Sequence, residues 1–158
     1  MNIAFKIIVL LLAVLAQTTI APKLMIAGAT PNISLLVIIF IAFKTPLNEI
    51  FHYAFWSGLA LDAFSINDFG ASALCFSITA FLAHQIHEKL FVNDVLSRIL
   101  LVVFCVAVNS ILFFLIINRN YLYEYPRSLF FYGIPSILYS AILGTIITLL
   151  FYYRRQHD

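Results

Sequence analysis

The 158-residue sequence has very little charge, because only 10% of its residues are Asp, Glu, Lys or Arg. Soluble domains carry about a quarter of their residues as charged side chains. In place of charge the chain has 63% hydrophobic residues, and 16% of all residues are aromatic. This composition excludes an ordinary soluble domain and predicts a single integral membrane domain over residues 1–158.

Other features are also scarce. The nine basic residues exceed the seven acidic ones by two, a net charge of +2 that is too small to predict a nucleic-acid surface, so we expect no nucleic-acid partner. The two cysteines, Cys75 and Cys105, lie in apolar runs and do not suggest a disulfide framework. The sequence contains no nucleophile elbow, Gly-rich phosphate loop, HExxH or CxxC motif. We therefore expect no enzyme, no cofactor and no metal site.

Charged residues and turn formers divide the chain into six apolar segments, at about 5–21, 31–43, 48–65, 70–88, 97–117 and 129–152. Helices satisfy their own backbone hydrogen bonds in lipid, so these segments predict an all-α polytopic membrane protein, a compact bundle of about six transmembrane helices. The first segment resembles a signal peptide, but no clean cleavage site follows, and we interpret it as a retained helix. The second is shorter than the roughly 20 residues of a straight crossing, so a short or partly re-entrant segment is an alternative.

The distribution of Lys and Arg predicts an orientation, because cytoplasmic loops are enriched in basic residues. With six spans and a cytoplasmic N-terminus, the basic residues on the cytoplasmic side would be Lys6, Lys44, Lys89, Arg98, Arg154 and Arg155. Only Lys23, Arg119 and Arg127 would lie outside. Both termini are therefore predicted to be cytoplasmic, whereas a five-span arrangement would move one of them to the other side.

Polar residues within the third segment require an explanation. Ala54, Gly58 and Asp62 are spaced at i, i+4 and i+8, so they share one helix face, and the two small residues allow a neighbouring helix to approach closely. A carboxylate inside a membrane usually marks a functional or a paired residue. Two interpretations of Asp62 stay open: a polar anchor for a partner or an ion, or a helix-end carboxylate that accepts backbone hydrogen bonds across the turn Ser65–Gly70.

Three further candidates lie in the last two segments. Asn109 is near the middle of the fifth segment, where a buried amide usually bonds across helices. Ser140 and Gly144 form a small-xxx-small pair that we interpret as packing within the chain.

Two histidines in the fourth segment form a weak metal signal. His84 and His87 are spaced at i, i+3 beside Glu88, and neutral imidazoles are common metal ligands. No second ligand cluster with suitable spacing accompanies them. The alternative is two histidines hydrogen-bonded near the cytoplasmic headgroups.

The third and fourth segments together resemble the signature of the rod shape-determining protein MreD family. The residues that carry the resemblance are the run Trp56–Ser65 and its continuation Phe69–Leu74. In that family a Gly-x-x-x-Asp helix end, a short turn and a Leu-Gly-type restart form the best-preserved stretch, and Gly58, Asp62 and Gly70 occupy these places here.

The first two segments agree with the same family. The first segment ends near Ala16 and Gln17, and the second is entered through a Pro-x-Leu-like sequence, Pro31-Asn32-Ile33. The chain departs from the family at Asn32, where an acidic residue is common, and at 66–68, where the usual turn contains Gly or Pro.

The resemblance implies a non-enzymatic inner-membrane component of the cell-elongation machinery of a rod-shaped bacterium. Such a protein binds the bitopic protein MreC and is linked through the assembly to MreB, RodA and a penicillin-binding transpeptidase. It also implies a six-helix arrangement similar to the substrate-binding subunits of energy-coupling-factor transporters. The alternatives are a vitamin-binding subunit of such a transporter and an intramembrane enzyme. Candidate structural or partner-contacting residues are Gly58, Asp62, Gly70, Asn109, Ser140 and Gly144.

Overall fold

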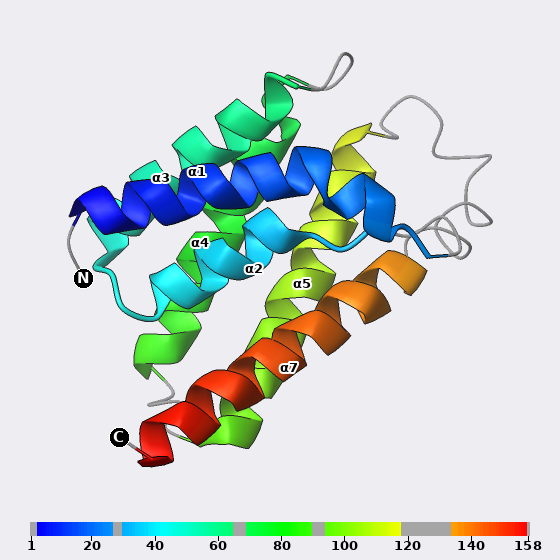
Figure 1. The fold of residues 1–158 in the computed structure, drawn as a ribbon. Coiled ribbons are helices and arrows are strands. Elements are labelled where there is room, and N and C mark those ends of the chain that lie inside the picture. Colours follow the sequence, from blue (N-terminus) through cyan, green and yellow to red (C-terminus); the bar gives the residue numbers. More distant parts are fainter. Residues whose placement is uncertain (1–2, 27–29, 65–68, 90–93, 118–133, 158) are drawn as a thin grey trace.

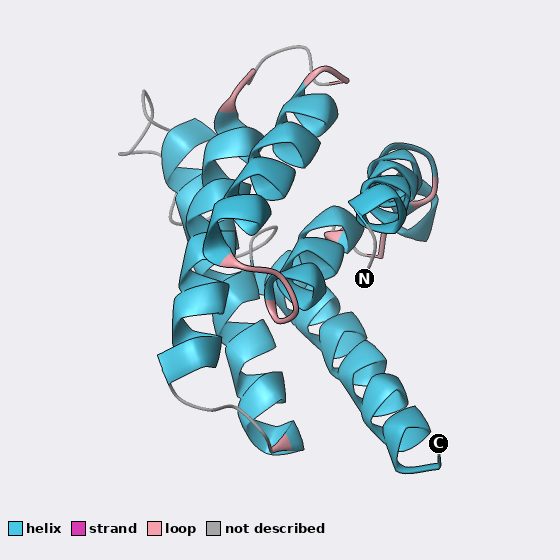
Figure 2. Cartoon of the chain, turned by 90° about the vertical axis from the view of Figure 1, so that its left-hand side faces the viewer, coloured by secondary structure: helices cyan, strands magenta, loops and turns pink. Residues whose placement is uncertain are grey.

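The computed structural model describes residues 3–26, 30–64, 69–89, 94–117 and 134–157. These residues form only helices and the short segments that join them (Figures 1 and 2). The elements are α1 (Ile3–Thr19), the 3-10 helix η1 (Ala21–Leu24), α2 (Ile33–Ala42), α3 (Leu47–Asp62), α4 (Ala71–Lys89), α5 (Val95–Ile117) and α7 (Ile134–His157). The predicted all-helical fold is therefore confirmed, and each predicted apolar segment corresponds to one of the six described α-helices.

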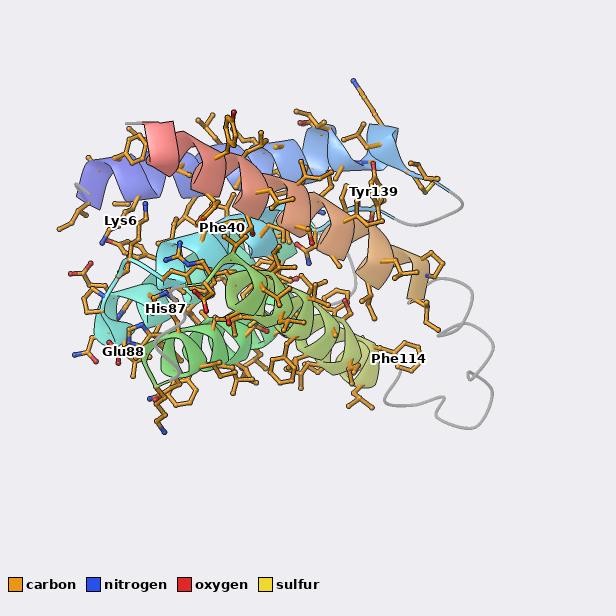
Figure 3. All side chains as sticks on the ribbon, turned by 90° about the horizontal axis from the view of Figure 1, so that it is seen from below. Lys6, Phe40, His87, Glu88, Phe114 and Tyr139 are labelled. Atoms are coloured by element: carbon orange, nitrogen blue, oxygen red, sulfur yellow. The ribbon has the colours of Figure 1, made fainter. Side chains whose placement is uncertain are left out.

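Successive helices run in alternating directions, so the bundle has two distinct ends. We call the end at which α1 begins and α7 ends the terminal end. The opposite end, where α3 passes into α4, we call the turn end. Figure 3 shows Lys6, His87 and Glu88 together at the terminal end and Phe114 at the opposite end.

The short helix α2 lies at the centre of the bundle. It contacts α1, α3, α4, α5 and α7. Its side chains Leu35, Ile38 and Ile39 are at most 1% exposed. The helix has 10 residues, which at about 1.5 Å per residue is roughly half of the 30 Å hydrocarbon core of a bilayer. The predicted short second segment is confirmed, and α2 serves as a core element around which the longer helices pack.

Among the described helices, α5 is the one that has the length and composition to cross a membrane unaided, over the 22 residues Val95–Ile116. The apolar parts of α1, α2 and α7 (Ile134–Leu150) are shorter. The number of crossings consequently stays a prediction. Residues 129–133 of the sixth predicted segment lie outside the described residues, and α7 continues past the predicted end to His157.

Large apolar side chains cover the outside of the bundle as well as its core. On α1 the side chains of Phe5, Ile8 and Leu12 are each at least 55% exposed, and on α7 Leu138 and Ile142 are each 57% exposed. Lipid tails solvate an exposed apolar surface of this kind, which here extends over several helices. The outer surface thus fits a membrane environment, as the composition predicted.

Candidate functional site

The helices α3 and α4 touch backbone to backbone at Gly58. A Cβ atom on Gly58 would lie 2.5 Å from the Cα of Ala73, 2.6 Å from its nitrogen and 2.7 Å from the carbonyl oxygen of Ser72. Real Cβ contacts are longer, so only glycine permits this crossing. Ala54 and Asp62, on the same face of α3, are 0% and 1% exposed.

Asp62 lies at this crossing, at the turn end. Its Oδ2 accepts hydrogen bonds from the backbone N–H groups of Gly70 (3.0 Å) and Ala73 (3.1 Å), and its Oδ1 accepts one from Ser72 (3.1 Å). The first N–H groups of a helix have no partner within the helix and carry the positive end of its dipole. The last residue of α3 therefore caps the N-terminus of α4. This geometry favours the second interpretation of Asp62, a helix-end carboxylate with backbone donors.

Gly70 enters α4 with a backbone conformation that other residues rarely adopt. Its φ is +95°, in the left-handed region. Apart from Gly70 itself and its two chain neighbours, no atom of the described residues lies within 4 Å of the place that a Cβ would occupy. Its requirement for glycine is therefore conformational, unlike that of Gly58, which is a matter of space.

Asn109 connects α5 to α4. Its side chain is buried, and its Oδ1 accepts a hydrogen bond from the hydroxyl of Thr79, with 3.3 Å between the two oxygens. The sequence indicated an interhelical bond for Asn109 but not its partner. Thr79 could have been suspected only as a hydroxyl residue in an apolar stretch of the fourth segment.

The N-terminus of α2 is held by side chains from three helices. From α1, the Oε1 of Gln17 accepts hydrogen bonds from the N–H groups of Ile33 (2.7 Å) and Ser34 (3.4 Å), and its Nε2 donates to the carbonyl oxygen of Pro31 (3.1 Å). From α2 itself, the Oδ1 of Asn32 accepts from the N–H of Leu35 (3.1 Å). The hydroxyl of Ser34 in turn donates to the carbonyl oxygen of Ala13 in α1 (3.1 Å).

The third helix at this junction is α7. The Oγ of Ser140, which is 1% exposed, accepts a hydrogen bond from the N–H of Asn32 (3.0 Å). The hydroxyl of Ser136 donates to the carbonyl oxygen of Thr30 (3.0 Å). We call the hydrogen bonds from Gln17, Ser136 and Ser140 to residues 30–34 the α2 clasp.

Gly144 lies one turn beyond Ser140 on α7. A Cβ atom there would lie 2.6 Å from Cγ1 of Val102 and 2.9 Å from Cδ2 of Leu36. Ser140 and Gly144 thus both face α2 or α5 within the chain.

Sequence reasoning did not find Gln17 as a member of this junction. Its one signal was position, since Gln17 is the polar residue that follows the apolar run 7–16. Its partners are backbone groups, which leave no trace in the sequence.

At the terminal end, an ion pair joins α1 to α3. The Nζ of Lys6 lies 2.9 Å from Oε2 of Glu49 and 5.5 Å from the centroid of the Tyr53 ring. Lys6 is 5% exposed, although the sequence indicated only a basic residue at the membrane face. Glu49 is in the first turn of α3, where a carboxylate also stabilises the helix dipole.

The two histidines of the weak metal signal, His84 and His87, both have partners within the chain. The ring of His84 has its Nδ1 3.3 Å from the carbonyl oxygen of Ala42, at the end of α2, and its Nε2 3.4 Å from Oε1 of Glu88. The ring of His87 stacks on Phe43, with centroids 4.8 Å apart and planes at 16°. In the part of the chain that the structure describes, no three His, Cys, Asp or Glu side chains come together as metal ligands would.

Among the buried side chains that the structure describes, that of Thr45 has a polar atom without a hydrogen-bond partner. The hydroxyl oxygen of Thr45, in the link between α2 and α3, is inaccessible and makes no hydrogen bond. A buried unsatisfied group of this kind costs folding free energy.

The fold and these junctions define a helical membrane protein whose buried polar side chains join its helices to one another. Residues 1–155 match the family of the rod shape-determining protein MreD. The chain therefore belongs to the MreD family, and the resemblance noted in the sequence is confirmed. No curated protein and no solved structure matches the chain. The predicted likeness to substrate-binding subunits of energy-coupling-factor transporters consequently stays a prediction.

Proposed function

We propose that this chain is a non-enzymatic scaffold of the bacterial cell-elongation complex, a multi-pass protein of the inner membrane that binds an MreC-like bitopic protein. Membership of the MreD family gives the coarser statement, a membrane protein that acts in rod shape determination. MreB, RodA and a penicillin-binding transpeptidase are linked to the chain indirectly, through that partner. The orientation proposed is the one that the basic residues predict, with the terminal end in the cytoplasm.

The observation that carries the proposal is an apolar face formed by α1, α2 and α7. Both α1 and α7 pack on α2, yet they make few contacts with each other. In Figure 1 they approach each other at the right and diverge toward the labelled N and C ends. The partly buried side chains Ile33, Val37 and Phe40, spaced at i, i+4 and i+7, form one stripe of α2. We call this stripe, together with the flanking helices, the α1–α7 face.

A single apolar helix is the occupant that the chemistry of this face suits. Inside a bilayer, helices associate through close van der Waals packing and not through the hydrophobic effect, so an apolar stripe between two diverging helices offers contact area to a third helix. The single membrane span of an MreC-like protein has this form. In this proposal the six candidate residues hold the scaffold in shape and do not touch the partner; they are Gly58, Asp62, Gly70, Asn109, Ser140 and Gly144.

Site-specific photo-cross-linking in native membranes tests the proposal. A photoreactive amino acid replaces Phe40 on the α1–α7 face or, as a matched control, Phe104, which is 49% exposed on α5. The expected result is an adduct with an MreC-like single-span protein from position 40 and none from position 104. Adducts from position 104 alone, or from neither position, contradict the proposed face. Mild detergent extraction followed by mass spectrometry of bound molecules tests the function itself, because recovery of ATPase subunits or a vitamin would identify a transporter subunit instead.

A further inference from the structure

The α2 clasp joins two helices that otherwise have little connection. Gln17 in α1 and the serines of α7 bind consecutive backbone groups of the same five residues, 30–34. The two helices make few direct contacts. The N-terminus of α2 therefore couples the position of α1 to that of α7.

Away from the clasp, α1 and α7 are held by different helices. At the terminal end α1 is tied to α3 by the ion pair between Lys6 and Glu49. The helix α7 packs on α5, with Gly144 against Val102. The helices α1 and α7, which diverge in Figure 1, therefore both bind the N-terminus of α2 at one end. Farther from the clasp α1 is held by α3, whereas α7 is held by α5.

We propose that the α2 clasp is a conformational joint that sets the angle between α1 and α7. Gln17 and Ser140 are its positioning residues. The consequence for partner binding rests on the proposed function, since this angle determines how widely the Ile33–Val37–Phe40 stripe is open to a single helix.

Hydrogen-bond geometry gives the joint its stiffness. Backbone N–H groups in lipid must find acceptors, and those of Asn32 and Ile33 find them on α7 and on α1 respectively. Hydrogen bonds weaken steeply when distance or angle departs from the optimum. A rotation of α1 against α7 would leave one of these two N–H groups without its acceptor.

Electron paramagnetic resonance on the isolated chain in nanodiscs tests this inference. Spin labels on Ile8→Cys in α1 and Ile146→Cys in α7, both exposed positions, report the distance between the diverging halves. The buried Cys75 and Cys105 are first replaced by Ala. The parent is expected to show one narrow distance distribution. Gln17→Met, which keeps the shape of the side chain but removes its hydrogen bonds, and Ser140→Ala are each expected to broaden and shift that distribution.

Thr79→Val is the matched control, because it removes another buried interhelical hydrogen bond, the one between α4 and α5, without touching the clasp. It should leave the distribution between α1 and α7 as in the parent. The inference is overturned if both clasp variants give the parent distribution, or if Thr79→Val broadens it equally. If Gln17→Met does not accumulate, Ser140→Ala alone decides. The measurement needs no partner, so a clasp that behaves as expected beside failed cross-linking would overturn only the proposed function.

Discussion

Asp62 caps a helix to which it does not belong. Its Oδ2 accepts the N–H of Ala73, eleven residues further along the chain and on the opposite side of the α3–α4 turn, at 3.1 Å. Two more backbone donors, Gly70 and Ser72, converge on the same carboxylate. The hairpin is thereby closed by three hydrogen bonds at its tip and by the contact of Gly58 with the α4 backbone one turn deeper.

Replacing Asp62 should open this hairpin tip. Asp62→Ala leaves three backbone N–H groups without this acceptor, and two of them, those of Ser72 and Ala73, are buried. One buried N–H group without an acceptor costs about 1–3 kcal/mol. Asp62→Asn keeps one acceptor oxygen and should lose less. Thermal unfolding of the purified protein in detergent measures both losses. Equal melting temperatures for the parent and Asp62→Ala would contradict the capping role.

The two buried glycines should respond differently to the same substitution. At Gly58 an added methyl group meets the backbone of Ala73, which can move only if the helices separate, whereas at Gly144 it meets the side-chain ends of Val102 and Leu36. Gly58→Ala is therefore expected to lower the melting temperature more than Gly144→Ala. Overpacking of a core typically costs about 1–3 kcal/mol, and Gly58→Ala should lie at or above the upper limit. The opposite order of the two melting temperatures would refute the assignment.

Gly70 should be sensitive to backbone preference and not to size. Gly70→Ala places a side chain in the left-handed region, at a cost of about 1–2 kcal/mol. Gly70→Asn should cost less, although Asn is larger, because Asn tolerates this conformation. Comparing the two melting temperatures distinguishes strain from crowding, since crowding predicts a greater loss for Asn.

Thr45→Val should stabilise the protein. The substitution keeps the shape of the side chain and removes a buried hydroxyl that has no partner. Relief of such a group is expected to contribute up to about 1–3 kcal/mol. Thr45→Ser, which retains the hydroxyl and loses a methyl group, is the control and should not stabilise. A lower melting temperature for Thr45→Val would show that the hydroxyl has a partner in the membrane.

The sequence predicted the helices and the inward faces well, because those depend on local patterns. Charges and turn formers mark where helices end, and the i, i+4, i+8 spacing identified the face of α3 that bears Gly58 and Asp62. The short α2 followed from length alone. These are properties of neighbouring residues, so a single chain reveals them.

The long-range junctions could not be predicted in this way. Asn32 and Ser140 are separated by 108 positions, and the bond between them joins a backbone N–H to a hydroxyl. Any serine on an inward face could have supplied that acceptor. Lys6 shows the same limit, because a charge near a helix end indicates the membrane face, while its burial against Tyr53 depends on how α1 packs on α3.

The separation of Asn32 from Ser140 also bears on the order in which the protein can assemble during translation. The tip of the α3–α4 hairpin has all its partners within residues 62–73 and can close as soon as these leave the ribosome. The N-terminus of α2 must wait for Ser136 and Ser140, which are 106 and 108 positions further along the chain than their partners Thr30 and Asn32. The short helix α2 thus acquires its full set of hydrogen bonds only when α7 is inserted.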